Sequence, residues 1–249
     1  MVRYISSLFP KSFRSGIPET YKSSDRDFCL VCDVNLEEST FYIRNKICPD
    51  CRFHYSMTAR ERIDFLADQG SFKEINRSLV SLDPLSFSSR TSYKDRLFSD
   101  QKRTGLTEAV VTGTCTIDGI SCGLAILDFG FLGGTMGCVV GEKVSLAFER
   151  AAKMKIPVIS VVTSGGSRIQ EGVLSLMQMA KTSVASNYLN EKGIPYISIL
   201  ANPATGQAYA SFANLADIIL AEPGAIAVSY THLRAHETSL HLVCRLLLE

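Results

Sequence analysis

The stretch that decides the fold is VISVVTSGGSRIQEG, residues 158–172. It begins with a short run rich in β-branched residues, which stops at Gly165 and Gly166, and a stretch of helical character follows at once. Glycine is favoured where the backbone must turn unusually or where another group approaches it closely. We therefore predict a strand, a tight glycine loop and a helix, with a ligand or a reacting atom lying against the loop.

The same alternation extends on both sides of this stretch. Upstream, two β-rich segments at 109–117 and 120–129 flank the dipeptide at 118–119, an Asp-Gly pair typical of a hairpin turn. A second glycine loop, GGTMG at 133–137, follows the hairpin. Alternating strands and helices predict an α/β core with parallel pairing. The remaining expected elements are helices over 141–154, 168–191 and 207–215 and strands over 158–162, 196–200 and 217–221.

The segment before this core begins with a helix-start signal. Thr58 and Glu61 form a capping box, and the short amphipathic helix that they open is expected to stop at Gly70. Residues 71–106 are polar and read as irregular, apart from a helical turn at 93–97.

Four of the eight cysteines form the pattern C-x2-C-x15-C-x2-C. Each C-x-x-C directs two thiolates at one point, and two such knuckles complete a tetrahedron, so the spacing is that of a zinc ribbon rather than of four unrelated thiols. Four thiolates leave no open position for water, so we predict one structural Zn²⁺ per chain. The expected ligands are Cys29, Cys32, Cys48 and Cys51.

Three other cysteines are interpreted as small buried residues. Counting outward from the Asp-Gly turn places Cys115 opposite Cys122, and Cys138 follows the second glycine loop. A disulfide between the first two is disfavoured, because a protein with thiolate ligands belongs in a reducing compartment.

Composition and charge bound the function. The chain has 249 residues, of which 46% are hydrophobic, and 26 Lys and Arg against 25 Asp and Glu, so its charge does not favour nucleic acid or an anionic membrane as the partner. No apolar run approaches the roughly 18–20 residues that span a bilayer. We expect a cytoplasmic protein, or a protein of the plastid stroma in a plant or alga.

The composition divides the chain into four segments. Residues 1–26 read as a basic, serine-containing leader and linker, for which a transit-like targeting signal is the alternative. The ribbon covers 27–57 and the α/β core 58–227. Residues 228–249 form a tail that does not fit the pattern of the core.

The glycine loops suggest chemistry carried by the backbone. Where a glycine loop enters a helix, unpaired N–H groups and the helix dipole favour an anion. The N–H groups of Gly165 and Gly166 are therefore candidates to stabilise a developing oxyanion. The alternative is a glycine pair that only permits a sharp turn. A serine nucleophile is disfavoured, because neither Ser164 nor Ser167 lies in a G-x-S-x-G elbow and His54 is the only histidine before the tail.

Taken together, these motifs resemble one family over about residues 27–227, the carboxyltransferase β subunit of bacterial-type acetyl-CoA carboxylase. In order along the chain they are the four-cysteine ribbon, MTARERIDFLADQGSFKEI, YKDRL, GGTMGCVVGEK, SGGSRIQEG, SLMQMAKTS, GIPYISIL and AEPGAIA.

The resemblance implies a crotonase-like core, in which ββα units wind into a superhelix. It also implies an enzyme that transfers a carboxyl group from carboxybiotin, borne on a biotin carboxyl carrier protein, to acetyl-CoA. The product would be malonyl-CoA for fatty-acid synthesis. The implied partners are a carboxyltransferase α subunit in an α2β2 assembly and biotin carboxylase, with ATP bound at the level of the whole complex.

The resemblance also assigns residues. SGGSR is similar to the family's SGGAR, which gives Gly165 and Gly166 the oxyanion role in catalysis. GGTMG is similar to GGSMG, which places Gly133 and Gly134 at the acyl-CoA pocket. Arg168 is expected to bind a phosphate or carboxylate of the substrate, with a plain helix-surface arginine as the alternative.

The tail departs from the family at Val228, where the family continues with a glycine-aromatic-glycine loop. We interpret VSYTHLRAHETSLHLVCRLLLE as translated adapter sequence joined to a truncated gene, so that part of the pocket is expected to be missing. The alternative is a second metal site at His232, His236 and His241, which the partial i, i+4 spacing only weakly favours.

Two rival functions remain. One is a carboxyltransferase for another acyl-CoA such as propionyl-CoA, although those enzymes carry both halves on one longer chain without a ribbon. The other is a nucleic-acid-binding protein built on the ribbon, near Arg44, Lys46 and Arg52. Neighbouring acidic residues offset that charge, so this role is possible but not favoured.

Overall fold

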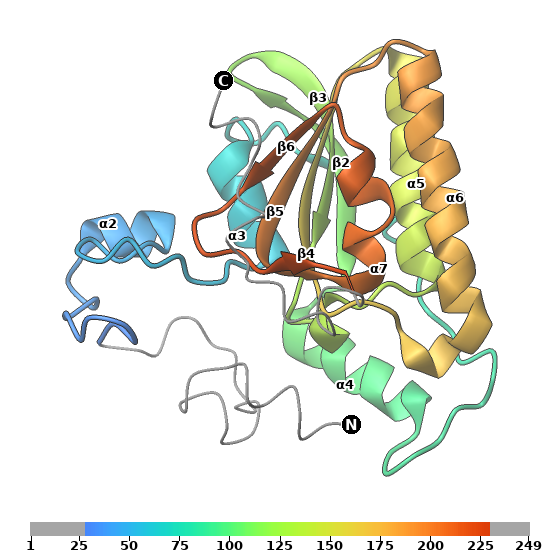
Figure 1. Cartoon of the computed structure of the whole chain (residues 1–249), viewed down its shortest axis with the longest axis horizontal. Coiled ribbons are helices and arrows are strands. Elements are labelled where there is room, and N and C mark those ends of the chain that lie inside the picture. The colour runs from blue at the N-terminus through green and yellow to red at the C-terminus, as the bar shows by residue number, and fades with distance from the viewer. Residues whose placement is uncertain (1–27, 230–249) are drawn as a thin grey trace.

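The computed structural model describes residues 28–229. Its centre is one mixed sheet with the strand order β1-β2-β3-β4-β5-β6, and β7 pairs with β5 (Figure 1). The leader at 1–26 and the tail from residue 230 onward lie outside the described residues, and so do the tail histidines. The strands are β1 Lys73–Ile75, β2 Val110–Ile117, β3 Ile120–Leu127, β4 Val158–Ser164, β5 Tyr196–Thr205, β6 Ile218–Ala221 and β7 Ala227–Val228.

Half of the sheet is antiparallel and half is parallel. β1, β2 and β3 pair antiparallel, and the hairpin register places Cys115 opposite Cys122, as the Asp-Gly turn predicts. β4 pairs parallel with both β3 and β5, and β6 pairs parallel with β5. The predicted α/β core with parallel pairing is therefore confirmed for the second half of the sheet.

Helices cover both faces of the sheet. α5 packs against β2 and β3, and α6 packs along α5, so these two long helices form one layer (Figure 1). The short helix α3 lies on the opposite face. The α-helices are α2 Thr40–Asn45, α3 Ala59–Leu66, α4 Tyr93–Thr104, α5 Cys138–Met154, α6 Gly172–Glu191 and α7 Gly206–Tyr209, and the 3₁₀ turns are η2 Leu132–Gly134, η3 Ile169–Glu171 and η4 Phe212–Leu215.

The segment 71–106 corrects the expectation of irregular structure. It contains β1, which extends the sheet, and the three-turn helix α4. Ser92 caps α4 by accepting the N–H of Asp95, and Gly105 ends it in the left-handed conformation. The helix is difficult to predict because it buries only Tyr93 and Leu97.

The start of α6 also differs from the expected position. The helix begins at Gly172 rather than at Arg168, because residues 166–168 still pair with the second glycine loop: Met136 N–H donates to the Gly166 carbonyl, and Arg168 N–H donates to the Met136 carbonyl. The SGG loop therefore does not lead directly into a helix.

The ribbon packs around its own small core. Its two knuckles have the same geometry, since Asp33 N–H donates to the Cys29 carbonyl and Arg52 N–H to the Cys48 carbonyl, and both Asp33 and Arg52 are left-handed. α2 lies between the knuckles. The buried residues of this second core are Cys29, Leu36, Tyr42 and Cys48.

Candidate active site

The two glycine loops meet where neighbouring strands end. One loop follows β3 and the other follows β4, and because these strands are parallel their carboxyl ends lie at the same edge of the sheet. Gly165 N–H donates to the Gly133 carbonyl (N···O 2.8 Å), and Met136 N–H donates to the Gly166 carbonyl (2.8 Å). The structure thus brings together both loops that the sequence singled out.

Three of the four predicted site glycines need glycine's freedom. Gly133, Gly134 and Gly166 have φ values of 67°, 62° and 108°. A Cβ on Gly134 would also lie 2.3 Å from the carbonyl oxygen of Thr163, so no side chain fits there. Gly165 differs: its φ is not positive, its backbone is exposed, and a Cβ would lie 3.3 Å from the Gly133 oxygen. Gly165 is therefore the one of these four glycines whose backbone is exposed.

The N–H groups of the SGG loop already have acceptors. Gly165 N–H is bonded to Gly133, and Gly166 N–H donates to the hydroxyl oxygen of Ser164 (3.1 Å). The expectation that both N–H groups are open to an oxyanion therefore needs correction, because the first of them joins the loops. The Gly166 donor is different, since its acceptor is a side-chain hydroxyl that can rotate away.

Arg168 does not occupy the position expected of a substrate-binding residue. Its side chain is 0% exposed, and its guanidinium forms a bidentate ion pair with Glu108, which is also 0% exposed (2.7 and 3.0 Å). Arg168 is therefore neither a helix-surface arginine nor free for a phosphate, and we withdraw it as a substrate ligand.

The ion pair determines the ionisation of both partners. Burial by itself raises the pKa of Glu108, but the charge and hydrogen bonds of Arg168 outweigh it and leave the pKa below its usual range. Burial likewise lowers the pKa of Arg168, and Glu108 more than compensates for it. Both groups are charged at neutral pH, so this is a buried salt bridge.

Sequence reasoning did not find the residues around this pair. Ser81 lies in the segment expected to be irregular, Tyr93 begins the helical turn expected at 93–97, and Glu108 lies two residues before the start of β2. The available signal was an acidic residue at the entrance of an otherwise apolar strand, where a buried carboxylate needs a cationic partner.

The four-cysteine cluster has the geometry of a metal centre. The sulfur atoms of Cys29, Cys32, Cys48 and Cys51 all lie within 4.8 Å of one another, and the Cys29–Cys51 and Cys32–Cys48 pairs are 3.6 and 3.5 Å apart. A tetrahedron with Zn–S bonds of about 2.3 Å has edges of roughly 3.8 Å, so the cluster fits that ion.

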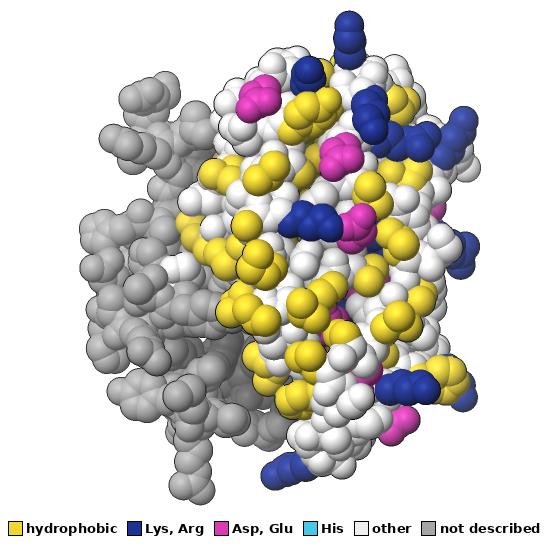
Figure 2. Space-filling model, turned by 90° about the vertical axis from the view of Figure 1, so that its right-hand side faces the viewer, with side chains coloured by type: hydrophobic (Ala, Val, Ile, Leu, Met, Phe, Trp, Pro, Cys, Tyr) yellow, Lys and Arg dark blue, Asp and Glu magenta, His cyan; other side chains and the backbone are white. Residues whose placement is uncertain are grey.

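Helix α6 presents exposed apolar side chains on its outer surface. Its apolar residues are not confined to the side that packs on α5, and its exposed apolar residues form much of the hydrophobic surface in Figure 2. Val173 is 65% exposed and Val184 is 70% exposed. The α6 face, as we call it, consists of Val173, Leu174, Leu176, Met177 and Val184 of α6, together with Ile169 of the preceding turn η3.

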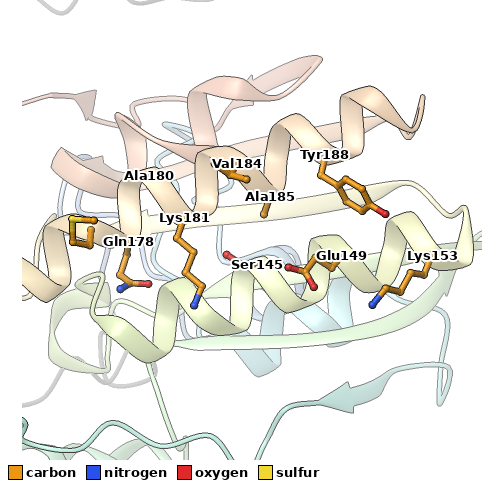
Figure 3. Close-up of a pocket in the computed structure, with 10 residues that line it drawn as sticks. Ser145, Glu149, Lys153, Gln178, Ala180, Lys181, Val184, Ala185 and Tyr188 are labelled. Atoms are coloured by element: carbon orange, nitrogen blue, oxygen red, sulfur yellow. The ribbon is translucent and has the colours of Figure 1, made fainter.

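A groove of about 700 Å³ runs between α5 and α6 beside this face (Figure 3). Glu149 and Lys153 of α5 and Tyr188 of α6 line it. Two buried atoms of its lining, Ser145 Oγ and Gln178 Oε1, form no hydrogen bond with any of the described residues.

None of the helices between residues 28 and 229 has the length and hydropathy to cross a membrane.

The comparisons with known proteins converge on one family. The model of the carboxyl transferase domain matches residues 55–231. The chloroplastic acetyl-coenzyme A carboxylase carboxyl transferase subunit beta of Cyanidium caldarium is 46% identical over 213 residues, which are 86% of this chain and 79% of that protein. The subunit beta of Desulforamulus reducens is 48% identical, over 85% of this chain and 72% of that protein.

Solved structures agree with these sequences. A transcarboxylase 12S structure with methylmalonyl-coenzyme A and methylmalonic acid bound is 31% identical, with a TM-score of 0.57, over 73% of this chain and 33% of that chain. A Pseudomonas malonate decarboxylase hetero-tetramer in complex with malonate is 28% identical, with a TM-score of 0.53, over 70% of this chain and 61% of that chain. The mixed α/β fold is thus that of the carboxyltransferase, crotonase-like proteins. With paired glycine loops at the strand ends, a four-cysteine cluster and relatives more than 45% identical, the chain belongs to the carboxyl transferase domain family, among the β subunits of acetyl-coenzyme A carboxylase carboxyl transferase.

Proposed function

We propose that the chain is the subunit that carries carboxyl transfer to acetyl-CoA, giving malonyl-CoA, and that the paired glycine loops are its reaction site. The observation that carries the proposal is the contact between the two loops through Gly165 and Gly133, in a chain 46% identical to a named β subunit. Biotin on a carrier protein supplies the carboxyl group. Such a subunit would work in the cytoplasm or in the plastid stroma.

This chain's part of the chemistry is positioning and backbone stabilisation. The exposed backbone of Gly165 and the half-buried backbone of Gly133 form a surface without side chains, against which a thioester lies closely. When the acetyl group becomes an enolate, its oxygen needs a donor that is fixed in advance. Gly166 N–H supplies it once the Ser164 hydroxyl turns aside, and Gly165 N–H keeps the loops together.

Substitution of Gly165 by Ala tests the site. The added methyl group fits the backbone with little strain but occupies the surface where the thioester lies. We expect malonyl-CoA formation, measured with the partner subunit and carboxybiotin, to fall about 100-fold, the order of magnitude for displacing a substrate by about 1 Å.

Gly123→Ala is the matched control. Its Cβ would also meet a neighbour at 3.3 Å, the methyl group of Ala151, but in the core of the hairpin and away from the loops. Equal activity of the Gly165 and Gly123 variants would contradict the proposed site. A wild-type complex that forms no malonyl-CoA would contradict the function itself.

We also propose that the four-cysteine cluster holds one structural Zn²⁺. Four sulfur ligands saturate the ion, so the chemistry that it supplies is the folding of the ribbon rather than activation of water. The fit of the sulfur–sulfur distances to a tetrahedron supports this assignment. The exposed ribbon surface includes Phe28, Val31 and Ile43, which favours a protein neighbour over nucleic acid.

Finally, we propose that the α6 face binds the carboxyltransferase α subunit, in an assembly that also engages the biotin carboxyl carrier protein and biotin carboxylase. The face gathers several exposed apolar side chains on one side of the molecule, which is typical of a protein interface.

Acetyl-CoA is the favoured acceptor, although the related transcarboxylase 12S structure holds methylmalonyl-coenzyme A. The named subunits beta are more similar in sequence to this chain than that structure is. Comparing kcat/KM for acetyl-CoA and propionyl-CoA in the same complex distinguishes the two acceptors.

A further inference from the structure

A cluster of buried polar side chains connects the two glycine loops. Arg168 follows the SGG loop, yet its side chain ends on Thr135 of the other loop. Its guanidinium donates to the Thr135 carbonyl oxygen (2.7 Å) and to Thr135 Oγ1 (3.2 Å), while two other N–H groups hold Glu108. One side chain therefore joins three segments that are distant in sequence.

Further contacts fix the cluster from outside. The hydroxyl groups of Ser81 and Tyr93 both accept hydrogen bonds from Arg168. Tyr93 in turn donates to Glu171 Oε1 (2.5 Å), whose second oxygen accepts the N–H of Cys138 at the start of α5 (2.6 Å). The guanidinium thus has a defined orientation, set by α4, by the strand entrance and by η3.

The planar shape of guanidinium makes this arrangement directional. When a carboxylate takes two N–H groups of an arginine in parallel, the remaining N–H groups point in fixed directions. Here they point at Thr135, the residue next to Gly134. Glu108 therefore orients Arg168, and Arg168 holds the GGTMG loop at a fixed distance from the SGG loop.

We propose that Arg168 is a positioning residue for carboxyl transfer, which sets the spacing of the two glycine loops through Thr135 without touching the substrate. This inference rests on the proposed function of those loops. A lysine can pair with Glu108, but its single ammonium group cannot hold Thr135 at the same time. Arg168→Lys therefore separates the charge of the pair from the positioning of the loop.

The experiment compares Arg168→Lys with the matched control Arg77→Lys, in which an exposed arginine changes in the same way. Both variants are assembled with the partner subunit and assayed for malonyl-CoA formation. We expect kcat of Arg168→Lys to fall about 100-fold, the order of magnitude for a misplacement of about 1 Å, while KM for acetyl-CoA changes less than about threefold. A purely structural role would lower the melting temperature and leave kcat of the assembled complex unchanged, which would overturn the inference.

Thr135→Val provides a second test that does not disturb the buried charges. It removes the acceptor of Arg168 Nε, together with the hydrogen bond that Thr135 Oγ1 donates to the Leu132 carbonyl, and keeps the carbonyl acceptor and the shape of the side chain. We expect a smaller loss of kcat than in Arg168→Lys. The double variant should be about as slow as Arg168→Lys alone, because both changes break the same contact between Arg168 and Thr135. If the fold-losses of kcat in the two single variants multiply in the double variant, the inference is overturned. If Arg168→Lys does not assemble, an unchanged kcat in Thr135→Val overturns it instead. A wild-type complex without activity would overturn the proposed function, and this inference with it.

Discussion

Single residues in this protein show how a buried charge is tolerated. Glu108 and Arg168 are both withdrawn from water, and each is held in its charged form chiefly by the other, with the Glu171 carboxylate 3.7 Å from the same guanidinium. A buried pair of this kind adds little net stability when compared with apolar residues, but breaking it leaves an uncompensated charge. The pair is therefore sensitive to the loss of either partner.

Glu108→Gln should cost about 3 kcal/mol of the free energy of unfolding at pH 7, since Arg168 then loses its bidentate partner and keeps only the more distant carboxylate of Glu171 (3.7 Å). The folded pKa of Glu108 is lowered, so its contribution is fully present above the ordinary carboxyl range and is lost as the pH falls through the folded pKa. The difference between wild type and variant should therefore shrink on acidification. Urea unfolding of the full chain across this pH range measures it.

The control is Glu142→Gln, which breaks the exposed pair with Lys181. An exposed pair contributes about 0–1 kcal/mol, so this variant should remain close to wild type. A Glu108→Gln loss that is the same at every pH would show that packing, rather than ionisation, is responsible.

The role of Arg168 was not predictable from the sequence. SGGSRIQEG shows an arginine next to a loop, but the partner that buries it lies sixty residues upstream, at Glu108. The glycines were predictable, because Gly133, Gly134 and Gly166 require left-handed backbone that is a local property. The hydrogen bonds that join the two loops depend on the fold and are not visible in the local sequence.

At the scale of elements, predictability followed local signals. The hairpin register follows from an Asp-Gly turn and the start of α3 from its capping box, and both are confirmed. The start of α6 was misplaced because Met136 and Arg168 pair across the loops, a contact between distant segments that overrides local helical character.

The ribbon is the element whose folding should depend on metal. Cys48→Ser removes one of four ligands, and we expect bound zinc to fall from one ion per chain to none, since structural zinc sites contribute about 10–16 kcal/mol to folding. The ribbon's small core of Leu36 and Tyr42 should then open to protease, while the sheet persists on its separate core. Metal analysis and limited proteolysis measure these two effects.

Cys115→Ser is the matched control, because Cys115 is paired with Cys122 in the hairpin and lies outside the cluster. This variant should keep its zinc and its protected ribbon. Retention of zinc by Cys48→Ser would contradict the four-sulfur site.

At the scale of the whole molecule, the two long helices form a layer whose outer side is not polar. The α6 face places Val173 and Val184 in solvent although the rest of the helix packs on α5. A surface helix of a monomer typically has a polar outer face, so the exposed apolar residues of α6 favour a surface that another protein covers. In the assembly proposed above, this surface faces the partner subunit.

Val184→Glu should weaken association with the carboxyltransferase α subunit. The side chain is 70% exposed, so the free chain is expected to fold with a change in stability within about 0.5 kcal/mol, whereas the assembled complex would bury an unpaired carboxylate. The expected increase in Kd is about 30-fold, the order of magnitude for a change at the centre of an interface, and sedimentation of mixtures with the partner measures it.

Ile120→Glu is the control, since Ile120 is 66% exposed at the hairpin turn, away from α6. Equal binding of both variants would place the partner on another surface, and weaker binding of Ile120→Glu alone would assign it to the hairpin end of the sheet.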